Sequence, residues 1–406
     1  MQIQCARAPD FECFRNIFQG KLHAEDREEI FKVLRVGIPS DARIVDYLAA
    51  LDTGLYDQKA ASLLSVASTW AYSDVDTLAR MMRNRGIPNN QSVSVRLEND
   101  AILSDTTANV IQSRDGKVVI LCFGGTLPTN FIQLLLDFSS RPDSFFSSGL
   151  VHGGIFRGFL LLWPLLSLLL EGALYGYKIC DLAEADHLFH KCDTGFYPPT
   201  ELQAEKRLPK VYEEQGPCQP VRPEPGAPTA PPPGSPTGPR EAMQSLFITG
   251  HSLGGAMAVL TAALIHADSN LTPLKKKLRG VYTFGQPMVG DAVFARTFDP
   301  LFGKMLFRHI YRRDVVPHLP PRSMGDFIHF GQELKSTQSN WEMDDARAPQ
   351  ALLGLSALAS GGASFLLDQF PLLGRVHLSY SIADHSPLNY LRTSLQSVPG
   401  SELLPA

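Results

Sequence analysis

The sequence predicts an α/β protein with a mostly parallel central sheet that carries helices on both faces. Short, continuous apolar runs recur along the chain, and stretches with helical spacing separate them. An apolar run bounded by glycine is typical of a strand that is buried on both faces, as strands of a parallel sheet are. With 406 residues, 44% of them apolar, the chain is long enough to bury a large core.

The first elements along the chain are predicted helices. Apolar residues follow helical spacing at Glu28–Arg35, Gln58–Tyr72 and Asp74–Asn84. We interpret residues 1–57 as an amino-terminal helical extension and residues 58–400 as one main domain.

Strands begin after these helices. Ser92–Leu97 alternates apolar and polar residues, as a half-exposed strand does, and Asn109–Gln112 indicates a second strand. Arg114–Lys117 carries a hairpin turn signal. Val118–Phe123 is wholly apolar and predicts a central strand, with Cys122 as buried packing.

A second set of strands and helices follows in the carboxyl-terminal half. Strands are predicted at Ser245–Thr249, Gly280–Phe284 and Met305–Tyr311, and helices at Ala256–Ala267 and Leu388–Leu395. This alternation is the observation that predicts parallel strands.

Between the two halves lies a proline-rich segment. Ten of the 25 residues in Gly216–Arg240 are proline. Such a composition cannot bury enough apolar area to offset the entropy of ordering it. We predict an insert at about residues 175–243 that is an extended spacer, with partner docking through its prolines as the alternative.

Composition and motif spacing exclude several classes of protein. The formal net charge is −4, and the basic run Lys275–Lys277 resembles a solvated helix end more than a nucleic-acid patch. No pair among the six cysteines has zinc-finger spacing, so a metal site is not expected. Nothing in the sequence predicts an oligomeric state.

Two apolar stretches raise the question of a membrane. Phe159–Leu170 is 12 residues long, whereas a spanning helix needs roughly 20. Ala351–Leu373 is diluted by glycine and polar residues. We expect a buried helix or an interfacial flap for each. Met1–Gly20 lacks the basic start and apolar middle of a secretory signal, which favours a cytoplasmic location, with peripheral membrane association or another export route as alternatives.

The strongest chemical signal is Gly250–Gly255, which reads Gly-His-Ser-Leu-Gly-Gly. It fits the Gly-x-Ser-x-Gly nucleophile elbow and stands between a predicted strand and a predicted helix, as the elbow must. Side chains at Gly250 or Gly254 would collide with those neighbours. Ser252 is the predicted nucleophile, and the amide of Leu253 would face the oxygen of the attacked carbonyl at the helix amino terminus. This motif predicts the α/β-hydrolase fold.

The acid and the base of such a site follow the serine in the chain. Asp314 comes just after a predicted strand and is the candidate acid, although a surface pair with Arg312 or Arg313 is the alternative. His385 lies on a loop that Pro387 enforces before the last helix, and it is favoured as the base. The other histidines after the serine are His266, His309, His318, His329 and His377, of which His377 is the strongest rival.

With these residues identified, the chain resembles the class 3 lipases, a fungal-lipase-like branch of the α/β hydrolases. Five ordered segments beside the elbow resemble that family: 118–126, 151–156, 283–291, 313–320 and 384–390. The resemblance covers roughly residues 60–395 without the insert. It implies Ser252, Asp314 and His385 as the triad, and Thr126 as a second oxyanion donor beside Leu253.

The chain also departs from this family. The family often has Arg where Gly124 or Gly125 stands here, and the extension, the insert and Ala351–Leu373 are additional. The family's lid follows the oxyanion turn, where Asn130–Phe138 is an apolar, helix-like run. An apolar helix over the site would open against lipid, and a core-packed helix is the alternative.

The sequence therefore predicts a carboxylic ester hydrolase without metal or cofactor, most simply a triacylglycerol lipase that contacts a lipid interface transiently. A phospholipase or a short-chain esterase is the alternative within the class. A non-catalytic scaffold that docks through the proline-rich insert is the alternative outside it.

Overall fold

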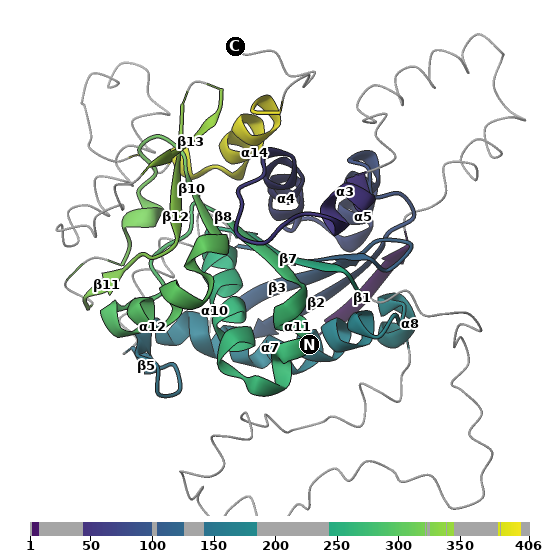
Figure 1. Cartoon of the computed structure of the whole chain (residues 1–406), viewed down its shortest axis with the longest axis horizontal. Helices are drawn as coiled ribbons and strands as arrows, with labels where there is room; N and C mark the ends of the chain where they lie inside the picture. Colours follow the sequence, from purple (N-terminus) through teal and green to yellow (C-terminus); the bar gives the residue numbers. More distant parts are fainter. Residues whose placement is uncertain are drawn as a thin grey trace, which may run out of the picture.

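A nine-stranded sheet forms the centre of the molecule, and helices cover both of its faces (Figure 1). The computed structural model describes residues 2–7, 44–99, 104–125, 142–184, 243–320, 322, 325–337, 339–344, 381 and 383–398. In spatial order the strands are β1 (Gln2–Arg7), β2 (Gln91–Asn99), β3 (Ser104–Gln112), β4 (Val118–Phe123), β7 (Ser245–His251), β8 (Leu278–Phe284), β10 (Leu306–Ile310), β12 (Gln332–Ser336) and β13 (Trp341–Asp344).

The middle of the sheet is parallel, as the apolar runs predict. β4, β7, β8, β10 and β12 pair in parallel with their neighbours. Every residue of β4 and β7 is buried. The strands toward the two edges are antiparallel, with β1, β2 and β3 on one side and β13 on the other. The sheet is therefore mixed, and the parallel part predicted from the sequence is its core.

Two hydrophobic cores lie on the two faces of the sheet, and β4 contributes to both. Val119, Leu121 and Phe123 belong to one core, while Val118, Ile120 and Cys122 belong to the other. Successive side chains of a strand point to opposite faces, which explains this division. Cys122 is buried and is a free cysteine, so the prediction of a packing role is confirmed.

Each core is closed by its own set of helices, which Figure 1 shows on opposite sides of the sheet. The first core is closed by α7 (Gly153–Leu174), α8 (Ile179–Glu184), α10 (Leu253–Ala267), α11 (Thr272–Lys277) and α12 (Ala292–Phe302). The second core is closed by α3 (Ile44–Ala49), α4 (Gln58–Trp70), α5 (Val75–Asn84) and α14 (Pro387–Gln396). α4 and α5 begin where Asp57 and Asp74 accept hydrogen bonds from the first-turn amides.

A small antiparallel sheet lies apart from the central one. Its order is β11 (Phe327–Ile328), β9 (Gly290–Asp291), β6 (Leu150–Val151) and β5 (Asp143–Ser144). Strand β6 leads directly into α7, and β9 leads into α12. This sheet therefore fixes where two helices of the first core begin.

The apolar stretch Phe159–Leu170 is part of α7, which is longer than the sequence predicts. The helix continues past Pro164 and has 22 residues. Of the helices that the structure describes, α7 is long and apolar enough to cross a membrane, by length and composition alone. Phe159, Leu162 and Leu166 are fully buried in the first core, so this side of α7 is an ordinary packing face.

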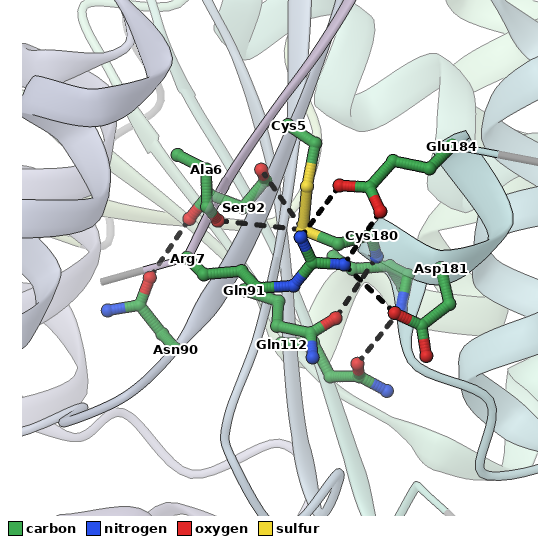
Figure 2. Close-up of a disulfide and its surroundings, with 11 residues drawn as sticks. Cys5, Ala6, Arg7, Asn90, Gln91, Ser92, Gln112, Cys180, Asp181 and Glu184 are labelled. Carbon is green, nitrogen blue, oxygen red and sulfur yellow. Dashed lines mark hydrogen bonds and ion pairs between the residues drawn. A yellow bond between two sulfur atoms is a disulfide. The ribbon is translucent and has the colours of Figure 1, made fainter. Parts of the chain in front are cut away.

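The amino terminus differs from the predicted helical extension. Gln2–Arg7 is a strand, β1, which pairs antiparallel with β2 and extends the central sheet. A disulfide joins Cys5 of β1 to Cys180 of α8 across 175 residues of sequence (Figure 2). The strand pairing and this cross-link make residues 2–7 part of the main domain. The prediction that these residues belong to a separate helical extension is therefore wrong.

Polar contacts surround the disulfide. Figure 2 shows the guanidinium of Arg7 directed at Asp181 and Glu184, at 2.9 and 2.7 Å. The side chain of Gln91 accepts a hydrogen bond from the Cys180 amide at 3.0 Å. Because the ion pairs are exposed, they add little stability, and the covalent bond is the stronger link between β1 and α8.

The start of the predicted insert also differs. Ile179 and Cys180 of α8 are buried in the first core, so residues 179–184 are folded structure rather than spacer. The proline-rich segment itself, the predicted lid at Asn130–Phe138, Ala351–Leu373 and the predicted helix Glu28–Arg35 lie outside the described residues.

Candidate active site

Ser252 stands alone between the last residue of β7 and the first residue of α10. Its φ is +59° and its ψ is −128°, a backbone conformation that is strained for any residue except glycine. A Cβ on Gly250 would collide with the backbone of Gly254, and a Cβ on Gly254 would collide with the carbonyl of Phe123. The strained elbow and its requirement for both glycines are as predicted from the sequence.

Asp314 follows β10 and is completely buried, so it is not a surface residue paired with a neighbouring arginine. Its Oδ2 accepts a hydrogen bond from Nδ1 of His385 at 2.7 Å, and the hydroxyl of Tyr390 donates to the same oxygen. The amide of Val316 donates to Oδ1 at 2.9 Å. Donors to both oxygens fix the plane of the carboxylate.

His385 ends a short 3₁₀ turn, Ala383–His385, directly before α14. Its loop is held against the acid by backbone hydrogen bonds: Ser381 donates to the Arg313 carbonyl at 2.8 Å, and Val315 donates to the Ser381 carbonyl at 3.3 Å. Because Nδ1 faces a carboxylate, it carries the proton, and the lone pair of Nε2 remains to accept one. His385 is therefore arranged as a general base.

Gly285 lies between the serine and the acid–base pair, at the same edge of the sheet. It follows β8, which lies between β7 and β10, and its φ is +61°. A Cβ there would lie 2.9 Å from Oδ2 of Asp314 and 2.9 Å from Nδ1 of His385. On the other side, the Ser252 amide donates to the Phe284 carbonyl at 2.8 Å. The three predicted triad residues thus lie at the same edge of the sheet, with His385 bonded to Asp314 and no hydrogen bond from the Ser252 hydroxyl to His385.

The hydroxyl of Ser252 lies in this buried environment. The side chain is 1% exposed, and among the described residues its Oγ has no hydrogen-bond partner. The amide of Leu253, at the first position of α10, is one of the helix amides that have no partner within the helix. It is placed to stabilise a developing negative charge on an attacked carbonyl oxygen.

The second predicted oxyanion donor, Thr126, lies outside the described residues. The two glycines before it are described. A Cβ on Gly125 would lie 2.8 Å from the carbonyl of His251 and would collide with the Tyr72 hydroxyl. The turn after β4 therefore passes directly against the nucleophile elbow, where a second donor is needed.

Three of the rival histidines, His266, His309 and His329, make hydrogen bonds away from the serine. His266 bonds the Ala262 carbonyl within α10, and His329 bonds the Pro317 carbonyl. His309 lies inside β10 between the Thr283 carbonyl and the Tyr56 hydroxyl, and burial lowers its pKa to about 3. His377 lies outside the described residues. In the described part of the chain, no group of three or more His, Cys, Asp and Glu side chains is arranged to hold a metal ion.

Comparison with known proteins identifies the sequence around this site. A family model described as lipase (class 3) matches residues 239–324, which contain the elbow and the acid. Residues 239–324 are therefore similar to the class 3 lipases. This matched segment contains Ser252 and Asp314, while His385 lies beyond it.

Individual relatives match over a similar region. A lipase of Rhizopus niveus is 41% identical over 98 residues, which is 23% of this chain and 24% of that protein. A lipase of Rhizomucor miehei is 43% identical over 96 residues, or 23% and 25%. The triacylglycerol lipase OBL1 of Arabidopsis thaliana is 41% identical over 76 residues, or 18% and 14%. The match thus spans about a quarter or less of each relative's own length.

Solved structures of fungal lipases align with more of the chain at lower identity. Lipase II from Rhizopus niveus is 20% identical, with a TM-score of 0.46 over 81% of this chain and 92% of that one. The Rhizomucor miehei lipase propeptide complex is 18% identical, with a TM-score of 0.47 over 84% of each chain.

Several residues of this site have roles that the sequence did not predict. Gly285 and Tyr390 contact the acid, and His251 and Tyr72 contact each other beside the serine. The apolar strand that ends at Gly285 is a usable signal, because a glycine at the end of a strand permits other residues to approach the backbone closely. No local pattern predicts the pairing of Tyr72 with His251, which are 179 residues apart.

Proposed function

We propose that this protein is a carboxylic ester hydrolase that acts through a Ser252–His385–Asp314 triad. The observation that carries the proposal is the 2.7 Å hydrogen bond between His385 and Asp314, both buried, at the same sheet edge as a serine on a strained turn. This arrangement supplies a nucleophile, a base of fixed tautomer and a buried carboxylate that stabilises the charged base.

The reaction has two halves. In the first, Oγ of Ser252 attacks the acyl carbon while Nε2 of His385 takes the hydroxyl proton. The amide of Leu253 stabilises the tetrahedral oxyanion, and His385 returns the proton to the leaving alcohol, which gives an acyl-enzyme. In the second, His385 takes a proton from water, the hydroxide attacks the acyl carbon, and the proton returns to Ser252 as the carboxylic acid leaves.

Triacylglycerols are the substrates that we propose first. The support is the match to the class 3 lipase family model and the similarity to two plant proteins that are named triacylglycerol lipases. Phospholipids and short-chain esters would be hydrolysed by the same chemistry, but each class of substrate needs differently shaped acyl and alcohol pockets in the enzyme. A transient contact with a lipid interface would accompany hydrolysis of water-insoluble substrates.

A chromogenic ester series of increasing acyl length tests the proposal. We expect hydrolysis by the native protein and a loss on the order of 10³-fold or more in kcat for Ser252→Ala. A jump in rate when a long-chain substrate forms an emulsion would support a lipase, and a flat response would indicate a short-chain esterase. Equal activity in Ser252→Ala would overturn the proposal, and inactivity of the native protein toward every ester would favour a scaffold.

We also propose that the protein matures in an oxidising compartment. The cytoplasmic location that the sequence favours stays a prediction, and the Cys5–Cys180 disulfide supports a different environment. Disulfides persist outside the reducing cytosol, where glutathione and thioredoxin keep thiols reduced. Peptide mapping of protein from its natural source, alkylated before digestion, tests this: the Cys5–Cys180 peptide pair is expected, and two alkylated cysteines would refute it.

A further inference from the structure

We infer that Tyr72 and His251 are positioning residues that fix the oxyanion turn, the nucleophile elbow and the base relative to one another. His251 precedes the nucleophile, and Tyr72 comes from the loop after α4. This inference rests on the proposed function, since it assigns to two further residues a role in the same reaction. Neither residue reacts with substrate; they act through the groups that do.

A packing contact and two hydrogen bonds connect the three parts. The hydroxyl of Tyr72 packs against Gly125, in the turn after β4, where a Cβ would collide with it. The Tyr72 hydroxyl then lies 2.8 Å from Nδ1 of His251. Nε2 of His251 lies 2.9 Å from the carbonyl oxygen of His385. We call this chain the Tyr72–His251 bridge.

The partners determine where each hydrogen lies. A carbonyl oxygen can only accept, so Nε2 of His251 carries the hydrogen and donates it to His385. In a neutral imidazole Nδ1 then accepts, so the Tyr72 hydroxyl donates to it. Each hydrogen bond in the bridge therefore has an assigned donor and acceptor. This assignment holds only while His251 is neutral.

The surroundings keep His251 neutral. Its side chain is 1% exposed, and its ring centroid lies 4.5 Å from that of His385. Burial and the neighbouring His385 lower the pKa of His251 well below its usual value. This matters for the reaction because His385 becomes positively charged when it takes the serine proton. A second charged ring at that distance would oppose this charge, whereas a neutral one does not.

The bridge completes a two-point attachment of the base. Asp314 holds the imidazole of His385 through Nδ1, and His251 holds the backbone of the same residue through its carbonyl. With both ends held, Nε2 of His385 keeps one position relative to the serine. A catalytic group that moves by about 1 Å can lose on the order of 100-fold in rate.

A set of three variants tests the positioning role. His251→Phe keeps a ring of similar size and removes both hydrogen bonds. His251→Gln offers an amide donor to His385 and an amide oxygen to Tyr72. Tyr72→Phe removes only the hydroxyl between Gly125 and His251. The matched control is Tyr56→Phe, which removes a similar tyrosine–histidine contact, of 3.2 Å to His309, away from the serine.

Rates on a soluble p-nitrophenyl ester are divided by the number of active sites, counted at saturation with a p-nitrophenyl phosphonate. We expect kcat to fall on the order of 10- to 100-fold in His251→Phe and Tyr72→Phe with KM nearly unchanged. His251→Gln should recover most of the loss, and Tyr56→Phe should match the native protein.

Two results would refute the positioning role of Tyr72 and His251, and both differ from a failure of the proposed function. If His251→Phe and Tyr72→Phe have native kcat per active site and lose only thermal stability, the two residues are structural and the inference is wrong. If His251→Gln is as slow as His251→Phe in soluble protein, the hydrogen bonds are not what matters, which also refutes it. If His251→Phe yields no soluble protein, Tyr72→Phe and His251→Gln alone decide. Failure of the proposed function would appear differently, as a native protein that hydrolyses no ester.

Discussion

Replacing Asp314 with asparagine tests the triad with the smallest change of shape. The carboxylate receives three hydrogen bonds: from His385 and Tyr390 at Oδ2, and from Val316 at Oδ1. An asparagine has one oxygen and one NH₂ group for these positions. If its oxygen accepts from the Val316 amide, its NH₂ group faces Nδ1 of His385.

An NH₂ group in that position changes the tautomer of the base. Two donors cannot share one contact, so Nδ1 must give up its hydrogen and accept instead. Nε2 then carries the hydrogen and cannot take a proton from Ser252. The corresponding substitution in a serine protease triad lowers kcat by about 10⁴-fold, which is about 5 kcal/mol of transition-state stabilisation. We expect a loss of this order here, with little change in KM.

The assay is kcat and KM on a soluble p-nitrophenyl ester, again per titrated active site. Asp384→Asn is the matched control, because Asp384 is the neighbour of the base and accepts a hydrogen bond from the Arg313 amide at 3.1 Å. An amide oxygen can accept that bond, so Asp384→Asn should stay within about threefold of the native kcat. A decrease below tenfold in Asp314→Asn, or an equal decrease in both variants, would refute the assignment of Asp314.

Three further predictions concern stability and the elbow. Burial lowers the pKa of three histidines. The pKa of His152 falls to about 4, that of His309 to about 3, and that of His251 well below 6.5. In the unfolded chain they bind protons near pH 6.5, so the stability they contribute is complete above that pH and is lost as the pH falls toward the folded values. The free energy of unfolding in urea should therefore drop by on the order of 2 kcal/mol per histidine between pH 6.5 and 5, and a variant His309→Gln with an unchanged drop would contradict this. Gly254→Ala should be inactive because its Cβ meets the Phe123 carbonyl, whereas Gly255→Ala, whose Cβ lies 3.0 Å from that of Gln286, should keep measurable kcat; the reverse order would contradict the elbow geometry. Cys5→Ser should lower the free energy of unfolding by about 5 kcal/mol with native kcat, because the cross-link spans 175 residues; an unchanged urea midpoint would show that the disulfide does not stabilise the fold.

The parts of this fold that the sequence predicts well are those with a local signal. β4 was expected at Val118–Phe123 and has those bounds, because a strand buried on both faces is apolar throughout. The elbow was predicted because its glycines and serine are adjacent in sequence and each is required by backbone geometry. Asp314 and His385 followed from chain order and from their positions after a strand and before a helix.

The parts that the sequence did not predict depend on contacts between distant residues. β1 pairs with β2 about 90 residues later, and its alternating polar and apolar residues also suit an exposed segment. Cys5 and Cys180 have no local spacing that indicates a disulfide, because six cysteines allow many pairings. Tyr72 and Tyr390 are aromatic residues of or beside helices, where a packing role is the usual one, and only the fold brings their hydroxyls to His251 and Asp314.

The claim at the centre of this account is that Ser252 is a nucleophile activated by His385. Trapping with a p-nitrophenyl phosphonate, followed by peptide mass spectrometry, tests it most directly, because the reagent forms a stable bond to the activated oxygen and needs no knowledge of the natural substrate. We expect one adduct, on Ser252, that forms orders of magnitude more slowly in His385→Ala. An adduct on another residue, or labelling of Ser252 at the native rate in His385→Ala, would contradict it.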